Sequence, residues 1–335
     1  MAVTTDRELR QVLTMSLAQR QKEIQDLVHS SNPLLAVLRE KGQIRPYYGA
    51  EIRVPLEIDT LKAQWFSGYD KLAIEPKELV NSAVFTPKNV FAGFSLTGTE
   101  LLANEGRGQI VDLITFYQRS AESSVKDAME VALHSDGTGS GGRSMIGLGG
   151  AIPVIATAGV YGGIDRQQQP IWRTSFFDVP GGDFPDIGTV WDATTARPII
   201  ERITLQRSKS GQYADLIVAD VKSYQAISAS LVAHLRVKSA RMETLGFEAV
   251  SIATAAGVVD IVCAAGVGTV MPENTIYGID TKSLTLYYHP SRNFVPSHDG
   301  DGSKPINQDA IAQGIMWNGE LVLSNPRFSY RLKTA

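Results

Sequence analysis

Hydrophobic and polar positions at the start of the chain predict two helices. Between residues 13 and 28, apolar side chains recur with a rough period of 3.6 residues among Gln, Lys and Glu, which is typical of an amphipathic helix. The sequence Ser30-Ser31-Asn32-Pro33 interrupts this pattern, and a short apolar segment, residues 34–38, then runs up to Gly42. We therefore expect an N-terminal helix and a shorter second one, each docking through one face.

Alternating apolar and polar side chains next predict two strands. Residues 49–59 and 90–96 both alternate, and Pro55 in the first run favours an edge strand. The segment between them is rich in aromatic and turn-forming residues, so the two runs predict the strands of one long hairpin or extended loop. A two-stranded arm is only marginally stable alone in water. A neighbouring subunit is therefore the expected cover for its apolar face, which carries Ile52, Val54, Leu56 and Ile58.

A long helix is predicted after Gly106. Its apolar positions step by three or four residues, which indicates one continuous stripe made of Ile110, Ile114, Tyr117, Ala121, Val125, Ala128 and Ala132. The opposite face is predicted to be charged and to carry Asp112, Arg119, Glu122, Lys126 and Glu130. A glycine-rich loop, residues 135–144, closes the helix and leads into residues 152–155, an apolar run with strand character.

The middle of the chain has the pattern of a mixed α/β layer. Residues 215–220 and 258–263 each contain a short buried strand, with a helix predicted between them near residues 221–235 and another over residues 190–209. Strands are expected again at residues 283–289 and 319–323. Strand-rich segments thus flank the α/β part on both sides, so we expect the outer segments to come together as one domain.

Composition excludes several classes of protein. The chain has 335 residues, 43% of them hydrophobic, and a formal net charge of −3, so it is not intrinsically disordered. Its one cysteine, Cys263, has no partner within the chain and excludes a disulfide scaffold. No apolar run is long enough to span a membrane, and the polar first ten residues lack a signal-peptide core. The near-neutral charge argues against tight wrapping of nucleic acid, and the default location is the cytosol.

Candidate chemistry is sparse. The five histidines are scattered without metal-ligand spacing, and Cys263 lies in an apolar strand where burial leaves a thiol inert. The loop from Gly137 to Ser144 resembles a phosphate-binding loop in spacing, but it follows a predicted helix, whereas a phosphate cradle follows a strand and opens a helix. A nucleotide-binding enzyme is therefore a minor alternative. We predict no catalytic, cofactor-binding or metal-ligating residues and no enzymatic activity.

The order of these elements resembles the major capsid proteins of tailed bacteriophages, which have the Hong Kong 97-type fold. Short motifs from about residue 30 to residue 325 are similar to one branch of that family. They are Gln64-Trp65-Phe66-Ser67-Gly68-Tyr69, Ser135-Asp136-Gly137-Thr138-Gly139, Gly162-Gly163-Ile164-Asp165-Arg166, Asp215-Leu216-Ile217-Val218-Ala219-Asp220, Arg292-Asn293-Phe294-Val295-Pro296 and Asn307-Gln308-Asp309-Ala310. Each motif is weak alone, but six in the same order are fairly specific.

The resemblance implies an α+β fold with named parts. These are an N-terminal arm (residues 1–44), an extended hairpin loop (45–92), a peripheral domain with a spine helix at 107–134 (93–154 plus 283–325), and an α/β axial domain (155–282 plus 326–335). The hairpin would lie over an adjacent subunit, with inter-subunit contacts at Trp65, Phe66, Tyr69, Arg53 and Glu57.

The implied function is structural. Copies of the chain would form pentamers and hexamers of an icosahedral shell that encloses double-stranded DNA without reading its sequence. Assembly in the bacterial host cytoplasm would yield the virion, with scaffolding, portal and possibly decoration proteins as partners and without a membrane. An encapsulin-like compartment shell, which loads an enzyme in place of a genome, is the alternative within the same fold.

Overall fold

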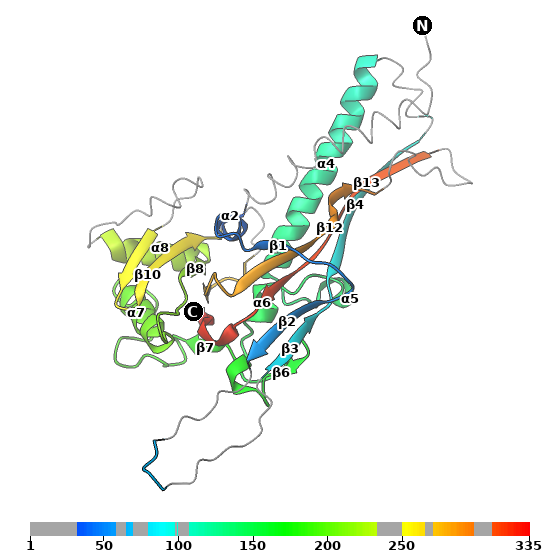
Figure 1. The fold of residues 1–335 in the computed structure, drawn as a ribbon. Helices are drawn as coiled ribbons and strands as arrows, with labels where there is room; N and C mark the ends of the chain where they lie inside the picture. Colours follow the sequence, from blue (N-terminus) through cyan, green and yellow to red (C-terminus); the bar gives the residue numbers. More distant parts are fainter. Residues whose placement is uncertain are drawn as a thin grey trace. The chain divides into compact units, whose positions relative to one another are not determined.

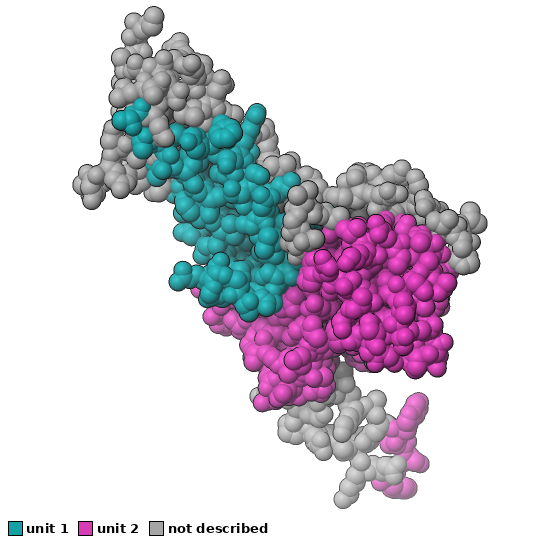
Figure 2. Space-filling view, turned by 180° about the vertical axis from the view of Figure 1, so that it is seen from behind, with its two compact units in different colours: residues 1–47, 87–147, 286–321 teal, residues 48–86, 148–285, 322–335 magenta. Residues whose placement is uncertain are grey.

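The computed structural model describes residues 32–57, 65–69, 80–97, 99, 107–232, 250–264, 271–297 and 310–335. The expected N-terminal helix over residues 13–28 lies outside these ranges. The chain divides into two compact units, each assembled from three separate segments (Figure 2). Unit 1 contains residues 1–47, 87–147 and 286–321, and unit 2 contains residues 48–86, 148–285 and 322–335.

Unit 1 is built on a sheet and one long helix (Figure 1). The described strands form a four-stranded sheet in the order β1-β12-β13-β4. They are β1 (Ile44–Pro46), β12 (Leu284–Pro296), β13 (Ala310–Leu323) and β4 (Lys88–Thr97). The short helix α2 (Pro33–Glu40) precedes β1, and the Asn32 side chain caps it by accepting a hydrogen bond from the Leu34 N–H at 2.9 Å.

The predicted long helix is confirmed as α4 (Arg107–His134). It packs on β4, where the Tyr117 and Phe94 rings stack with their centroids 5.8 Å apart. The predicted apolar stripe is wrong at one position, because Ala128 is exposed and Met129 is buried instead. The prediction that Glu122 lies on the charged face is also wrong, because it is buried next to Ala121 and one turn from Gln118 and Val125. The side chains of Ile110 and Ile114 lie outside the described part.

Unit 2 has a mixed sheet at its centre. The described strands form a six-stranded sheet in the order β7-β14-β11-β8-β10-β9. They are β7 (Ser175–Asp178), β14 (Tyr330–Lys333), β11 (Thr275–Ile279), β8 (Leu216–Ala219), β10 (Gly257–Cys263) and β9 (Val250–Thr254). β8 and β10 are parallel neighbours, as expected of a strand–helix–strand unit, and α8 (Val221–Val232) lies between them in the chain.

The core of unit 2 gathers on this sheet. Helix α7 (Ala196–Gln206) buries Ile199, Ile200 and Ile203 against strand residues such as Ile217 and Ile261. The last strand, β14, lies between β7 and β11, and its Tyr330 ring covers the position that a Cβ atom at Gly278 would take. This strand–helix–strand layer agrees with the pattern of the sequence.

Three expectations about the strands need correction. The run at residues 90–96 lies in β4, which pairs with β13 in unit 1, and is not the partner of β2 (Ile52–Glu57); that partner is β3 (Val80–Phe85). Residues 152–155 form no strand and follow the one-turn helix α6 (Leu148–Ala151). Finally, β12 and β13 extend well beyond residues 283–289 and 319–323. The sequence does not indicate these extensions, because polar residues and proline in β12 and glycines in β13 interrupt the alternation.

Candidate assembly surface

The extended hairpin is an antiparallel pair, β2 and β3, whose burial fades toward its tip. Ile52 pairs with Phe85 and Val54 with Ala83; of these four residues Val54 alone is not fully buried. Further along, Leu56 is half-buried and its partner Asn81 is exposed. Alternation along β2 is confirmed, since Arg53 and Pro55 are exposed on the other face. The hairpin is therefore rooted at one end and uncovered toward the other.

The tip presents three aromatic side chains to solvent. Within residues 65–69, Trp65 and Tyr69 are fully exposed, and Phe66 has 65% of its surface exposed. Single exposed apolar side chains are ordinary, whereas a group of them marks an interaction site. Tryptophan and tyrosine also carry a polar group, which suits a surface that is wet before assembly and buried afterwards.

The two charged candidates on β2 differ in what the structure shows. The Arg53 guanidinium pairs with the carboxylate of Glu51, the residue just before the strand, with Nη2 and Oε2 3.3 Å apart, and both side chains are exposed. An exposed ion pair of this kind contributes little to stability, so Arg53 is free to exchange partners. The side chain of Glu57 lies outside the described part of the chain.

The root of the hairpin rests on the turn between β5 (Val160–Tyr161) and β6 (Ile164–Asp165). The Val84 N–H donates to the Gly162 carbonyl at 2.9 Å. The Phe85 ring meets Tyr161 edge to face, with centroids 5.0 Å apart. Gly162 has φ +58°, and a Cβ atom there would overlap the Phe85 ring. Glycine is therefore required at this point of contact for two separate reasons.

Tyr161 and its surroundings fix that turn in unit 2. The Tyr161 carbonyl accepts a hydrogen bond from Trp172 Nε1 at 2.9 Å, and its hydroxyl accepts one from the Leu323 N–H at 3.0 Å. The buried Arg166 guanidinium lies 5.1 Å from the Tyr161 ring and donates to the carbonyl of Ala151 at 2.8 Å. Burial lowers the pKa of Arg166. The Gly162–Arg166 motif thus anchors the hairpin, a role that its residues alone did not suggest.

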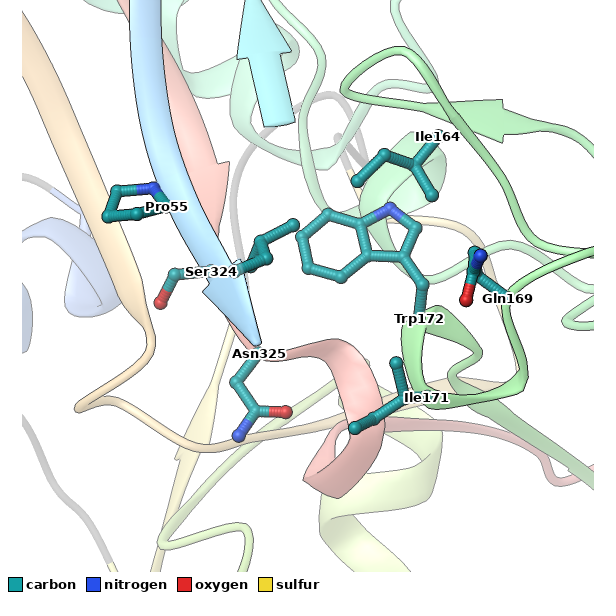
Figure 3. Close-up of a pocket in the computed structure, with 8 residues that line it drawn as sticks. Pro55, Ile164, Gln169, Ile171, Trp172, Ser324 and Asn325 are labelled. Atoms are coloured by element: carbon teal, nitrogen blue, oxygen red, sulfur yellow. The ribbon is translucent and has the colours of Figure 1, made fainter. Parts of the chain in front are cut away.

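A cavity of about 300 Å³ opens beside this anchor (Figure 3). Figure 3 shows the Trp172 indole at its centre, with Pro55 on one side and Ile164 and Gln169 on the other. The lining is apolar with a few amide and hydroxyl groups and includes no acidic or basic side chain: Pro55, Leu56, Ile164, Gln169, Ile171, Trp172, Ser324 and Asn325. These groups can hold an apolar surface but cannot supply acid–base chemistry.

The other chemical candidates offer little. In the described residues, no group of three or more His, Cys, Asp and Glu side chains could hold a metal ion. Burial, with a smaller contribution from the Asp220 carboxylate, raises the pKa of the Cys263 thiol, which makes it a poor nucleophile. No helix in the same ranges is long and apolar enough to cross a membrane.

The glycine-rich loop does not have the structure of a phosphate cradle. It follows α4, not a strand. Several of its N–H groups already have partners inside the loop: Gly137 donates to Ser135 Oγ, Thr138 to Asp136 Oδ1, Gly142 to the Thr138 carbonyl, and Ser144 to the Gly139 carbonyl. The Asp136 carboxylate at the start of the loop would also repel phosphate.

Comparison with known proteins identifies the fold. The sequence matches no family model and no curated protein sequence. The structure is similar to a subunit of the cyanophage A-1(L) capsid asymmetric unit, with a TM-score of 0.65, 14% identity, and coverage of 92% of this chain and 93% of that chain. It is also similar to the capsid of the native GTA particle, with a TM-score of 0.56, 12% identity and 89% coverage of both chains. The chain therefore has an α+β capsid fold, which is the fold class that its sequence predicts.

Proposed function

We propose that this chain is the major capsid protein of a tailed bacteriophage or a related particle. It self-assembles through pentamers and hexamers into an icosahedral shell that encloses double-stranded DNA. The observation that carries this proposal is the likeness to the cyanophage A-1(L) capsid subunit, which extends over 92% of this chain and 93% of the other. A match of that extent covers nearly the whole of both chains.

The extended hairpin supplies the contact between copies. Its root is fixed to unit 2 through Val84, Phe85 and Gly162, whereas the aromatic tip at residues 65–69 has no cover within the described chain. A tip on one side of a subunit that meets a different surface on the next makes a heterologous contact, and such contacts form a ring when the rotation from copy to copy closes. An icosahedral shell is built from rings of five and six subunits.

The division into units supports the assignment of the parts. Unit 1, with α4 and the β1-β12-β13-β4 sheet, corresponds to the peripheral domain and its spine helix. Unit 2, with the sheet that contains β8 and β10, corresponds to the axial domain and includes the root of the hairpin. In this proposal the axial domains meet around the five- and six-fold axes.

The shell contains DNA and contacts other proteins of the particle. A net charge of −3 suits a wall that holds DNA without binding it tightly. The virion is the final location, after assembly in the host cytoplasm with scaffolding and portal proteins and possibly decoration proteins. The chain acts as a structural protein and not as an enzyme.

Negative-stain electron microscopy and light scattering of the purified full-length chain test the proposal. Closed particles tens of nanometres across are expected, either from the chain alone or after addition of lysate from phage-infected cells, which supplies a scaffold. A chain that stays monomeric at high concentration under both conditions would contradict the proposal. Particles that form readily in the uninfected host and enclose a protein but no DNA would favour the encapsulin-like alternative.

A further inference from the structure

The chain leaves α4 through a glycine-rich segment, residues 137–147, which we call the connector. Gly137, Gly141 and Gly142 all have positive φ angles between 70° and 85°, so the connector folds back sharply. A Cβ atom at Gly147 would overlap the carbonyl groups of Ala132 and Leu133. The end of the connector is therefore pressed against the last turn of α4, immediately before the chain enters unit 2 at Leu148.

Two side chains of the sheet hold the connector in this position. The Glu320 Oε1 atom, from β13, accepts a hydrogen bond from the Ile146 N–H at 2.7 Å. The Lys88 ammonium, from β4, donates to the Gly142 carbonyl at 3.0 Å. Because Gly319 pairs with Lys88 in the sheet register, the two side chains start from adjacent positions of neighbouring strands.

The Glu320 carboxyl group is the unusual member of this pair. The residue is only 1% exposed, and its second oxygen, Oε2, is buried without a hydrogen-bond partner among the described residues. An ionised carboxylate has about four acceptor positions to satisfy, and here the backbone N–H groups of Ile146 and Leu321 fill only part of them. Burial therefore raises the pKa of Glu320 to about 8, although the Ile146 hydrogen bond, the Lys88 charge and the Leu321 hydrogen bond all act to lower it.

The ionisable side chains on the elements around Glu320 do not supply another counter-charge. His134, at the end of α4, is buried, and burial lowers its pKa to about 4, so it is neutral near pH 7. Arg143 of the connector is exposed. Lys88 is the side chain whose charge acts on the Glu320 pKa.

We propose that Glu320 is a proton-dependent clasp on the connector: the buried carboxylic acid holds Ile146 in place, and loss of its proton to solvent loosens the connector from the sheet. Lys88 is the second tether, through its hydrogen bond to the Gly142 carbonyl. This inference does not depend on the proposed function, because it concerns the single subunit. In this way pH changes how firmly the connector, which leads along the chain from unit 1 into unit 2, is held against the sheet.

The direction of the pH effect follows from linkage. When the connector opens, Glu320 reaches water and regains a pKa near its ordinary value of 4.5. Between that value and about 8, the closed form binds a proton that the open form does not, so rising pH favours opening. One proton changes the opening equilibrium by about tenfold per pH unit in this range. Above the raised pKa both forms are ionised, and the effect levels off.

Hydrogen exchange of the full-length protein, followed by mass spectrometry, tests the clasp. Protection of the peptide that contains Ile146 is measured from about pH 5 to about pH 9 and corrected for the intrinsic exchange rate at each pH. In the unaltered protein it should fall by up to about tenfold per pH unit and then level off near pH 8. Glu320→Gln keeps an acceptor for the Ile146 N–H but cannot ionise, so its protection should not change with pH. The exposed Glu273→Gln serves as the control and should behave like the unaltered protein.

Lys88→Met keeps the test decisive if Glu320→Gln does not fold. Without Lys88, protection should be lower at every pH because one tether is gone. The pH dependence should remain, and its plateau should move to higher pH because the Lys88 charge no longer lowers the Glu320 pKa. The proposal is overturned if the unaltered protein shows no slope, if Glu320→Gln keeps the slope, or if Lys88→Met abolishes it.

Discussion

The central sheet and the extended hairpin of unit 2 both carry large apolar side chains, but they differ in how far the unit itself buries them. In the sheet, apolar side chains from β8, β10, β11 and α7 meet one another and are almost completely buried. In the hairpin, the residues near the root are buried, and the aromatic residues at the tip are exposed. The same chain thus buries one apolar surface by itself and leaves the other uncovered.

The difference separates two uses of hydrophobic residues. Burial of the sheet stabilises the fold of the single subunit, because removal of apolar surface from water is the main favourable term in folding. The exposed tip gains nothing in the single subunit and becomes favourable only when another surface covers it. Substitutions in the two regions should therefore change different measurements.

The largest effect on folding is expected from a core residue of the sheet. Ile261 of β10 is fully buried, and Ile261→Ala should lower the free energy of unfolding by about 2–5 kcal/mol, because it removes buried methyl groups and leaves a cavity. Chemical denaturation measures this change. The matched control is Val258→Ala on the same strand: its side chain is 55% exposed, so a change within about 0.5 kcal/mol is expected. Equal losses in the two variants would show that the core is not where the structure places it.

A smaller effect is expected at the root of the hairpin, which links the two regions. At Gly162 the backbone has a positive φ angle, and an added Cβ atom would also overlap the Phe85 ring. At Gly163 the φ angle is positive too, but an added Cβ atom would have open space around it. Gly162→Ala and Gly163→Ala should both lose stability from backbone strain. Gly162→Ala should lose about 1–3 kcal/mol more, because it also overpacks against the ring. If the two variants are equally stable, the Phe85 contact does not hold the hairpin in solution.

Sequence reasoning identified both regions but not how they connect. Alternation correctly predicted strands at β2 and β4, because a period of two reports which face is buried. It could not give the partner of either strand, since pairing of β4 with β13 depends on residues more than two hundred positions away. The exposed tip was predicted from the aromatic residues between the strands, and whether it contacts another subunit stays a prediction.

Other features were missed because the sequence carries only a weak signal for them. Glu320 is one acidic residue beside the apolar run Leu321–Leu323, which could have indicated a buried carboxyl group. Its partner is a backbone N–H at Ile146, and backbone groups leave no mark in a sequence. Similarly, Arg166 belongs to a motif that was noticed, but its contacts with Tyr161 and the Ala151 carbonyl depend on the folded chain.

The smallest effect on folding, and the sharpest test of the comparison, is expected at the tip. Replacement of both Trp65 and Phe66 by Ser removes apolar surface that is already in water, so the free energy of unfolding should change by no more than about 0.5 kcal/mol. Assembly into closed particles, followed by electron microscopy and light scattering, should be lost, because the covering contact with the next copy is gone. Ile155→Ser, at an exposed apolar position of the same unit outside the hairpin, is the control and should still assemble. Intact shells from the tip variant would show that these aromatic residues do not join subunits, whereas a large loss of stability would show that the tip is part of the subunit's own core.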